Sequence, residues 1–121
     1  MAIEAVQRYY KAFNEALVTL KTTEMRKHFY PGCLVCEKDV SEIDKMARNG
    51  ERVTGGATIL RDFAITNRAP KHLTMLASAY SERMLIKDST GKVTLDQPAV
   101  TGPMNFTVFR RGETWILEGI S

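Results

Sequence analysis

Residues 3–20, IEAVQRYYKAFNEALVTL, contain the clearest structural pattern in this chain of 121 residues. Apolar side chains recur there every three or four positions, at Ile3, Val6, Tyr10, Phe13, Leu17 and Leu20. This spacing places them on one stripe of an α-helix, which turns once every ~3.6 residues. Tyr9 and Ala16 flank the stripe and widen it. We therefore expect this helix to lie on a sheet or inside a cone of sheet.

Two more helices are predicted before Gly50. A short second helix, capped by Thr22 or Thr23, should turn Met25 and Phe29 inward. The turn at Pro31-Gly32 separates it from a third helix over residues 33–49. The apolar stripe of the third helix is formed by Cys36, Val40, Ile43 and Ala47.

Beyond Gly50 the apolar period changes to two, which predicts β-strands. The predicted strands cover residues 59–65, 72–87, 104–110 and 114–120, and 93–95 is a short strand or the edge of a loop. Gly55-Gly56 indicates a bend or bulge before the first of them. Helices followed by a meander of strands are typical of an α+β fold. We expect three N-terminal helices packed on a strongly curved antiparallel sheet of about four strands.

The composition and charge of the chain argue against some classes of function. The chain carries 17 Lys and Arg against 14 Asp and Glu, a net charge of +3, and these residues are scattered. A nucleic-acid-binding surface usually needs a basic stripe with interleaved aromatic residues, so no nucleic-acid partner is expected. No apolar run approaches the roughly 18 residues of a membrane helix. The length fits one domain over residues 1–121.

The order of elements resembles the nuclear transport factor 2-like, or cystatin-like, superfamily. The resemblance rests on residues 9–16 of the first helix (YYKAFNEA), on Trp115-Ile116-Leu117, and on the long strands between them. Residues 30–36 (YPGCLVC) and 49–56 (NGERVTGG) also resemble an uncharacterised family of actinobacterial lipoproteins with this fold. Members of that family usually carry a lipidated signal peptide, so the resemblance implies an exported or lipid-anchored protein. No catalytic residue is established for that family, and none is carried over.

Cys33-x-x-Cys36 is the most informative short motif, and four interpretations compete. A structural disulfide suits an oxidising compartment and two cysteines with none left over. A redox dithiol is chemically feasible near a helix N-terminus, although it follows helices here instead of the strand of a βαβ unit. A zinc site would need His28 and His72 to complete four ligands. Two reduced thiols are the fourth alternative. The family resemblance favours the disulfide, and we expect no metal and no cofactor.

Candidate site residues follow partly from the resemblance. In cone-fold enzymes such as steroid isomerases, a first-helix tyrosine donates a hydrogen bond to an oxyanion while an acid on a strand acts as base. Tyr10 with Asp62 or His72 could perform those roles. An apolar ligand cavity is predicted to be lined by Tyr10, Met75, Met84, Met104 and Trp115.

The sequence therefore leads to ranked hypotheses. The first is a non-catalytic exported domain that binds a small apolar ligand or an envelope protein. The alternative is a small isomerase or dehydratase that uses the candidate residues just named. A third hypothesis is an assembly module that forms a homodimer through the outer sheet face, covering Phe63, Tyr80 and Phe109.

Overall fold

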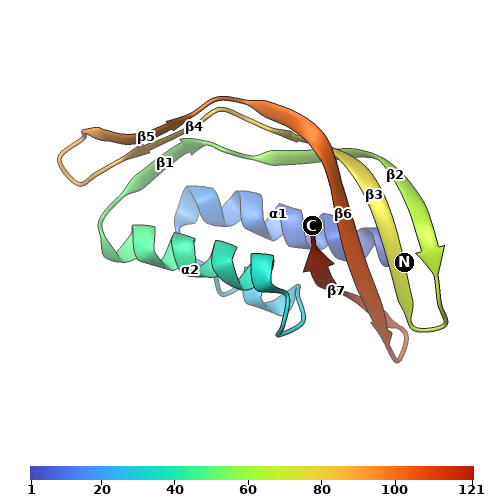
Figure 1. Ribbon diagram of the computed structural model, residues 1–121. Coiled ribbons are helices and arrows are strands. Elements are labelled where there is room, and N and C mark those ends of the chain that lie inside the picture. The colour runs from blue at the N-terminus through green and yellow to red at the C-terminus, as the bar shows by residue number, and fades with distance from the viewer.

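A curved antiparallel sheet wraps around the first helix, α1 (Ala2–Thr19), in the computed structural model, which describes residues 1–121 (Figure 1). The predicted stripe is confirmed: Val6, Tyr10 and Leu17 are buried. Tyr9 is also fully buried, although the pattern placed it beside the stripe. The reason is that α1 lies between the sheet and α2 (Leu34–Arg48), so both sides of its inner face are covered.

The expected second helix is only a single 3₁₀ turn, η1 (Met25–Lys27), so the chain has two α-helices rather than three. The Thr22 hydroxyl donates a hydrogen bond of 2.7 Å to Asp44 on α2 instead of capping a helix. Phe29 is buried, as predicted, but it forms an isolated parallel bridge with Leu117 at the edge of the sheet. The sheet edge thereby satisfies backbone groups that a longer helix would have used.

Seven strands form two antiparallel sheets, where the sequence predicted one sheet of about four strands. The larger sheet has the order β2-β3-β6-β7, with β2 (Thr58–Arg68), β3 (His72–Ser81), β6 (Val100–Arg111) and β7 (Thr114–Ile120). The smaller has the order β1-β4-β5, with β1 (Arg52–Gly55), β4 (Met84–Lys87) and β5 (Val93–Gln97). The smaller sheet continues the larger one and projects past α1 (Figure 1).

The two sheets meet along a line at which three long strands are interrupted at the same level. The interruptions are Gly56-Ala57, Glu82-Arg83 and Pro98-Ala99. Gly55, with φ +73°, makes the close approach possible, because a Cβ there would collide with the carbonyl oxygen of Arg83. The single strand predicted over residues 72–87 is therefore wrong, since β3 and β4 belong to different sheets.

The core lies between α1 and the concave face of the larger sheet. On β3 the alternate residues Leu73, Met75, Ala77 and Ala79 share one face, and all four are buried. Phe106, Val108 and Leu117 on β6 and β7 are fully buried against the same cluster. No helix in the structure has the length and apolar character that spanning a membrane requires.

Asn14 ties α1 to the sheet beside the interruption. Its side-chain amide donates to the carbonyl of Thr58 at 2.9 Å, and its Oδ1 accepts from the Thr58 N–H at 2.9 Å. The side chain thus acts as a strand partner for the first residue of β2. This pair of bonds fixes the position of the helix along the sheet.

Candidate functional site

The structure does not bring the predicted catalytic residues together. Tyr10 is inside the core with 7% of its surface exposed. Asp62 is exposed and lies with Leu76 and Ser78 around a shallow hollow on the convex face of the sheet. Asp62 sits in a β-bulge with φ +57°, and the extra residue reverses the alternation that the sequence pattern had assumed.

His72 also lies on the convex face, because it alternates with the buried residues of β3. Its Nδ1 is 3.4 Å from Glu118 Oε1, and its ring stacks on Phe109 with centroids 6.0 Å apart. An enzyme that pairs Tyr10 with Asp62 or His72 has no geometric basis in this fold, since the sheet separates them.

The predicted ligand cavity is largely filled by the chain itself. Met75 is fully buried and belongs with Tyr10 to the core cluster, and Met104 packs against that cluster. The side chain of Met84 lies beside Gly56 at the interruption between the sheets. Of the five residues proposed as cavity lining, Trp115 alone lines a substantial hollow.

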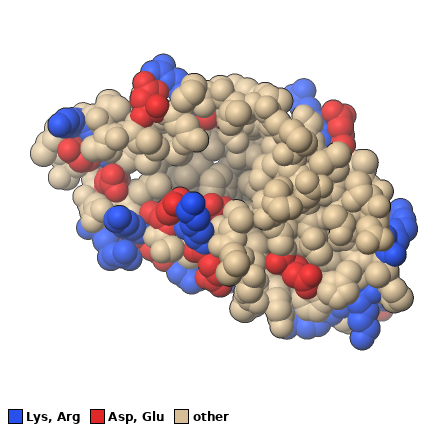
Figure 2. Space-filling view, in the orientation of Figure 1, with Lys and Arg blue, Asp and Glu red and all other residues tan.

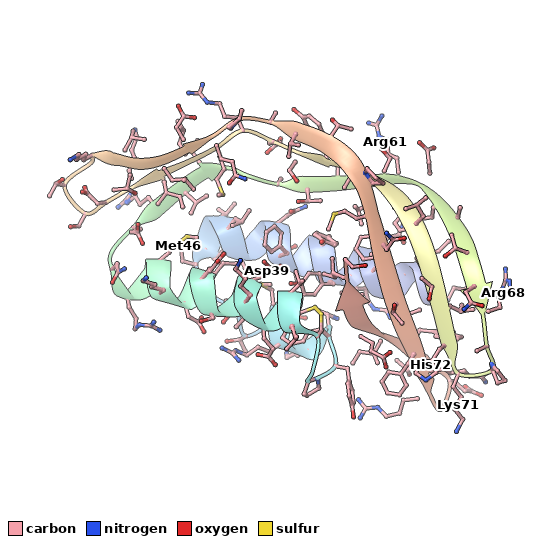
Figure 3. The ribbon with its side chains drawn as sticks, viewed as in Figure 1. Asp39, Met46, Arg61, Arg68, Lys71 and His72 are labelled. Carbon is pink, nitrogen blue, oxygen red and sulfur yellow. A yellow bond between two sulfur atoms is a disulfide. The ribbon has the colours of Figure 1, made fainter.

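A partly buried acid that the sequence analysis missed is Asp39 on α2. The hydroxyl of Tyr9 donates a hydrogen bond of 2.8 Å to Asp39 Oδ2, which joins α1 to α2 (Figure 3). Burial raises the pKa of Asp39 to about 6, and the Tyr9 hydrogen bond only partly opposes that rise. Burial and the nearby Asp39 also raise the pKa of Tyr10, so its phenol stays protonated. Asp39 could have been suspected because it adjoins Val40 on the inward stripe of α2.

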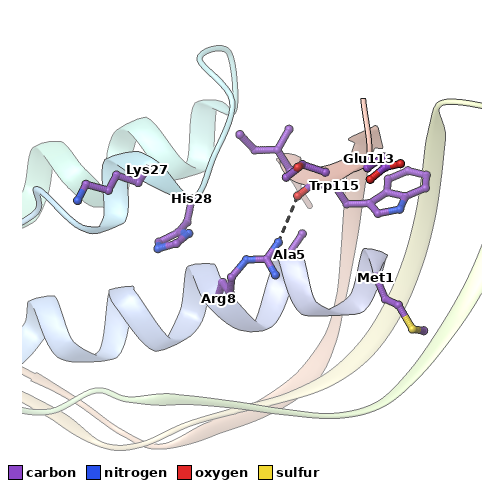
Figure 4. Close-up of a pocket in the computed structure, with 9 residues that line it drawn as sticks. Met1, Ala5, Arg8, Lys27, His28, Glu113 and Trp115 are labelled. Atoms are coloured by element: carbon purple, nitrogen blue, oxygen red, sulfur yellow. Dashed lines mark hydrogen bonds between the residues drawn. The ribbon is translucent and has the colours of Figure 1, made fainter. Parts of the chain in front are cut away.

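A groove runs along the outer side of α1, between η1 and the start of β7. Its first hollow has a volume of about 410 Å³ and is lined by Met1, Ala5, Arg8, Lys27, His28, Glu113, Thr114, Trp115 and Ile116 (Figure 4). A second hollow of about 520 Å³ shares Arg8 and His28 with the first and adds Lys11, Ala12, Glu15 and Glu24. We call these two hollows together the α1–β7 groove.

Charged side chains face each other across the α1–β7 groove. Arg8 Nη2 donates to the backbone carbonyl of Trp115 at 3.4 Å, as the dashed line in Figure 4 shows. On the opposite wall, Glu24 pairs with Lys27 and with His28 Nε2, each at 3.2 Å. Hydrogen bonds from Lys27 and His28 lower the pKa of Glu24. The sequence pattern gave no sign of this groove, because Arg8 lies outside the apolar stripe of the first helix.

Cys33 and Cys36 form a disulfide in the structure. Both residues are buried, with at most 1% of their surface exposed, so a redox partner would have no access to the sulfur atoms. The bridge closes a very short loop and should stabilise the fold by about 1–2 kcal/mol. It fixes the turn that precedes α2, where Cys33 is the N-cap residue. No group of three potential metal ligands is present.

The predicted dimer residues divide between the two faces. Phe63 packs against the core on the concave side, so it is not available to a partner. Tyr80 is 43% exposed on the convex side, and Phe109 lies there between Tyr30 and His72. Figure 2 shows a broad area without charged side chains on this side of the molecule.

No protein-family model and no curated protein matches the sequence. Solved structures do match. The intermembrane-space region of chloroplast protein ARC6 has a TM-score of 0.66 at 12% identity, covering 98% of this chain and 90% of that one. A proposed aromatic ring hydroxylase from Novosphingobium aromaticivorans has 0.62 at 16% identity, covering 98% and 85%.

A third structure is an uncharacterised protein with a cystatin-like fold from Caulobacter vibrioides, with a TM-score of 0.59 at 10% identity, covering 98% of this chain and 86% of that one. Identities this low establish a shared fold alone. The helices, the strongly curved sheet and these likenesses together show that the chain has the cone-shaped, cystatin-like fold of nuclear transport factor 2-like proteins.

Proposed function

We propose that this chain is a non-catalytic binding domain whose small ligand occupies the α1–β7 groove. The main observation that supports the proposal is that two hollows share Arg8 and His28 and therefore form one groove. The first hollow, of about 410 Å³, lies within the range of about 300–1,000 Å³ common for small-molecule sites. It also combines apolar walls with a few charged groups, as such sites do.

The enzyme hypothesis receives less support from the same geometry. The hydroxyl of Tyr9 is engaged with Asp39, and Tyr10 lies beneath core side chains. A catalytic group must come within hydrogen-bond reach of a substrate atom. In the α1–β7 groove the groups that could transfer protons are His28, the carboxylates and the lysines, and Glu24 is already paired with Lys27 and His28.

Protein NMR with a library of small fragments tests the proposal. We expect binding fragments to shift the backbone signals of Ala5, Arg8 and Ile116 and the indole signal of Trp115. Trp115 is the single tryptophan, so its indole N–H signal is unambiguous. Fragments that shift only residues outside the groove would contradict the proposal.

A matched pair of variants sharpens this test. Thr114 is exposed and lines the groove, so Thr114→Tyr should fill the site without disturbing the core. Thr101 is equally exposed on β6, opposite Tyr80, and Thr101→Tyr is the control. Binding should be lost in the first variant and kept in the second.

We also propose that the protein is exported, as the lipoprotein resemblance implies. A disulfide is stable in oxidising compartments and is uncommon in the cytosol, which supports this location. Fractionation of the producing cells should recover an oxidised protein outside the cytoplasm, and a cytoplasmic, reduced pool would refute export.

We further propose that the protein forms a homodimer in which a second copy packs on the convex face of the sheet. Sedimentation analysis would distinguish the monomer from the dimer.

A further inference from the structure

Arg8 is the least well paired arginine among those that make ion pairs in this chain. Its ion pair with Glu4 spans 3.8 Å and its hydrogen bond to Trp115 spans 3.4 Å. Arg26 and Arg83, by contrast, reach their aspartate partners at 2.7 Å. Charge-assisted hydrogen bonds are typically about 2.7–2.9 Å long. The two contacts of Arg8 are longer, so N–H donors of its guanidinium are available to a ligand.

Arg8 lines the first hollow together with His28 and Lys27, and its guanidinium is directed at the Trp115 carbonyl (Figure 4). His28 uses Nε2 for Glu24, and its Nδ1 makes no hydrogen bond within the protein. In the first hollow, Arg8 and Lys27 contribute two positive charges against the single negative charge of Glu113. Figure 4 places Glu113 with Trp115, away from the end where His28 and Lys27 lie. Glu24 pairs with Lys27 and His28, so Arg8 is the side-chain cation of this hollow that is not paired with a carboxylate of the groove.

The other end of the hollow combines Glu113 with apolar side chains. Ala5, Trp115 and Ile116 contribute to its lining, and the indole of Trp115 is half-buried. A ligand that fits both ends has a charged group and an apolar body. A planar carboxylate or a phosphate accepts two parallel hydrogen bonds from a guanidinium, which a lysine cannot reproduce.

We infer that the α1–β7 groove binds a small organic anion, a carboxylate or phosphate ester with an apolar body, and that Arg8 is its anchor. This inference rests on the proposed function, because it names the ligand class of the same groove. The anionic group lies between Arg8 and His28, and replaces the long bond from Arg8 to the Trp115 carbonyl. The apolar body lies against Ala5, Trp115 and Ile116.

Three probes of similar shape test the ligand class: 4-phenylbutyrate, its neutral amide 4-phenylbutyramide, and phenyl phosphate. Each is titrated into the folded protein while the Trp115 indole signal is followed by NMR. We expect phenylbutyrate to bind at least about tenfold more tightly than the amide, since a hydrogen-bonded charge contributes about 1.5–3 kcal/mol. The phosphate arm shows whether the site prefers a carboxylate or a phosphate.

Variants of Arg8 test the anchor. Arg8→Gln should weaken phenylbutyrate binding about tenfold or more and leave the amide unchanged. Arg8→Lys keeps the charge but loses the planar fork, so it should not restore full affinity. Arg61→Gln removes an equally exposed cation from β2, far from the groove, and should have no effect (Figure 3).

The outcomes separate the two proposals. Equal binding of acid and amide, unaffected by Arg8→Gln, would overturn the anion inference and leave the groove as a ligand site. If no probe moves the Trp115 signal and no fragment binds the groove, both proposals fail. Preference for an anion that depends on Arg8 supports both.

Discussion

Replacing Asp39 with asparagine should stabilise the protein at neutral pH. Burial raises the pKa of Asp39 from 3.8 to about 6, so the folded state holds its proton more tightly than the unfolded state does. The folded protein is therefore favoured below pH 3.8, and this contribution is lost as the pH rises through about 6.

The magnitude follows from the size of the shift. Each pKa unit corresponds to about 1.4 kcal/mol, so the full shift would cost about 3 kcal/mol above pH 7. Asp39 is only partly buried, and water screening reduces the cost to about 2 kcal/mol. Asparagine removes this cost and can still accept the hydrogen bond from Tyr9.

Urea denaturation at several pH values between 4.5 and 7.5 provides the measurement. The free energy of unfolding of Asp39→Asn should exceed that of the wild type by about 1–2 kcal/mol at pH 7.5, and the difference should shrink toward zero at pH 4.5. Glu37→Gln is the control, because it removes an exposed charge from the same helix that does not contribute to the raised pKa of Asp39. The raised pKa of Asp39 would be refuted if the stability of Asp39→Asn, measured relative to the wild type, were lower at pH 7.5 than at pH 4.5.

Two further predictions concern the backbone, and urea denaturation measures both. Gly55→Ala should lower the free energy of unfolding by at least about 2 kcal/mol more than Gly112→Ala does. Both glycines have positive φ, but only at position 55 would a Cβ collide with a backbone atom. Equal losses of stability in the two variants would contradict the close approach at Gly55. Asn14→Ala should cost about 2–3 kcal/mol, since it leaves both backbone groups of Thr58 without partners, whereas the exposed Asn67→Ala should change stability by less than about 0.5 kcal/mol. A small effect of Asn14→Ala would show that water replaces the two hydrogen bonds between Asn14 and Thr58.

Local patterns in the sequence predict the parts of the fold that depend on local burial. The stripe of α1 and the extent of α2 follow from helical periodicity. The inner face of β3 follows from strict alternation, because no bulge interrupts its pairing with β6. In each case one contiguous segment carries the whole signal.

The errors arise where a distant segment decides the local structure. The break between β3 and β4 depends on Gly55, which lies on a neighbouring strand. The alternation of side chains along β2 is broken at Asp62 because the strand has a bulge there against β3. Asp39 was overlooked because its partner, Tyr9, is 30 residues away in the sequence. No sequence period carries such information.

The candidate site was harder to predict than the fold. Arg8 lies on the polar side of an amphipathic helix, a position normally assigned to solvent. It becomes part of a groove only when β7 and η1 are placed beside α1. Trp115 was predicted to line a cavity inside the cone, whereas the hollow that it lines in the structure is a different one, on the outer side of α1.

The aligned interruptions of the three long strands also separate a part of the molecule that should unfold locally from a part that should unfold only with the whole chain. β4 and β5 contact mainly each other and β1, and every residue of β5 is exposed. The larger sheet, by contrast, is anchored by α1 and by Phe106, Val108 and Leu117. Amide protons of the smaller sheet should therefore exchange with solvent through local fluctuations, while those at the centre of β3 and β6 exchange only when the whole chain unfolds.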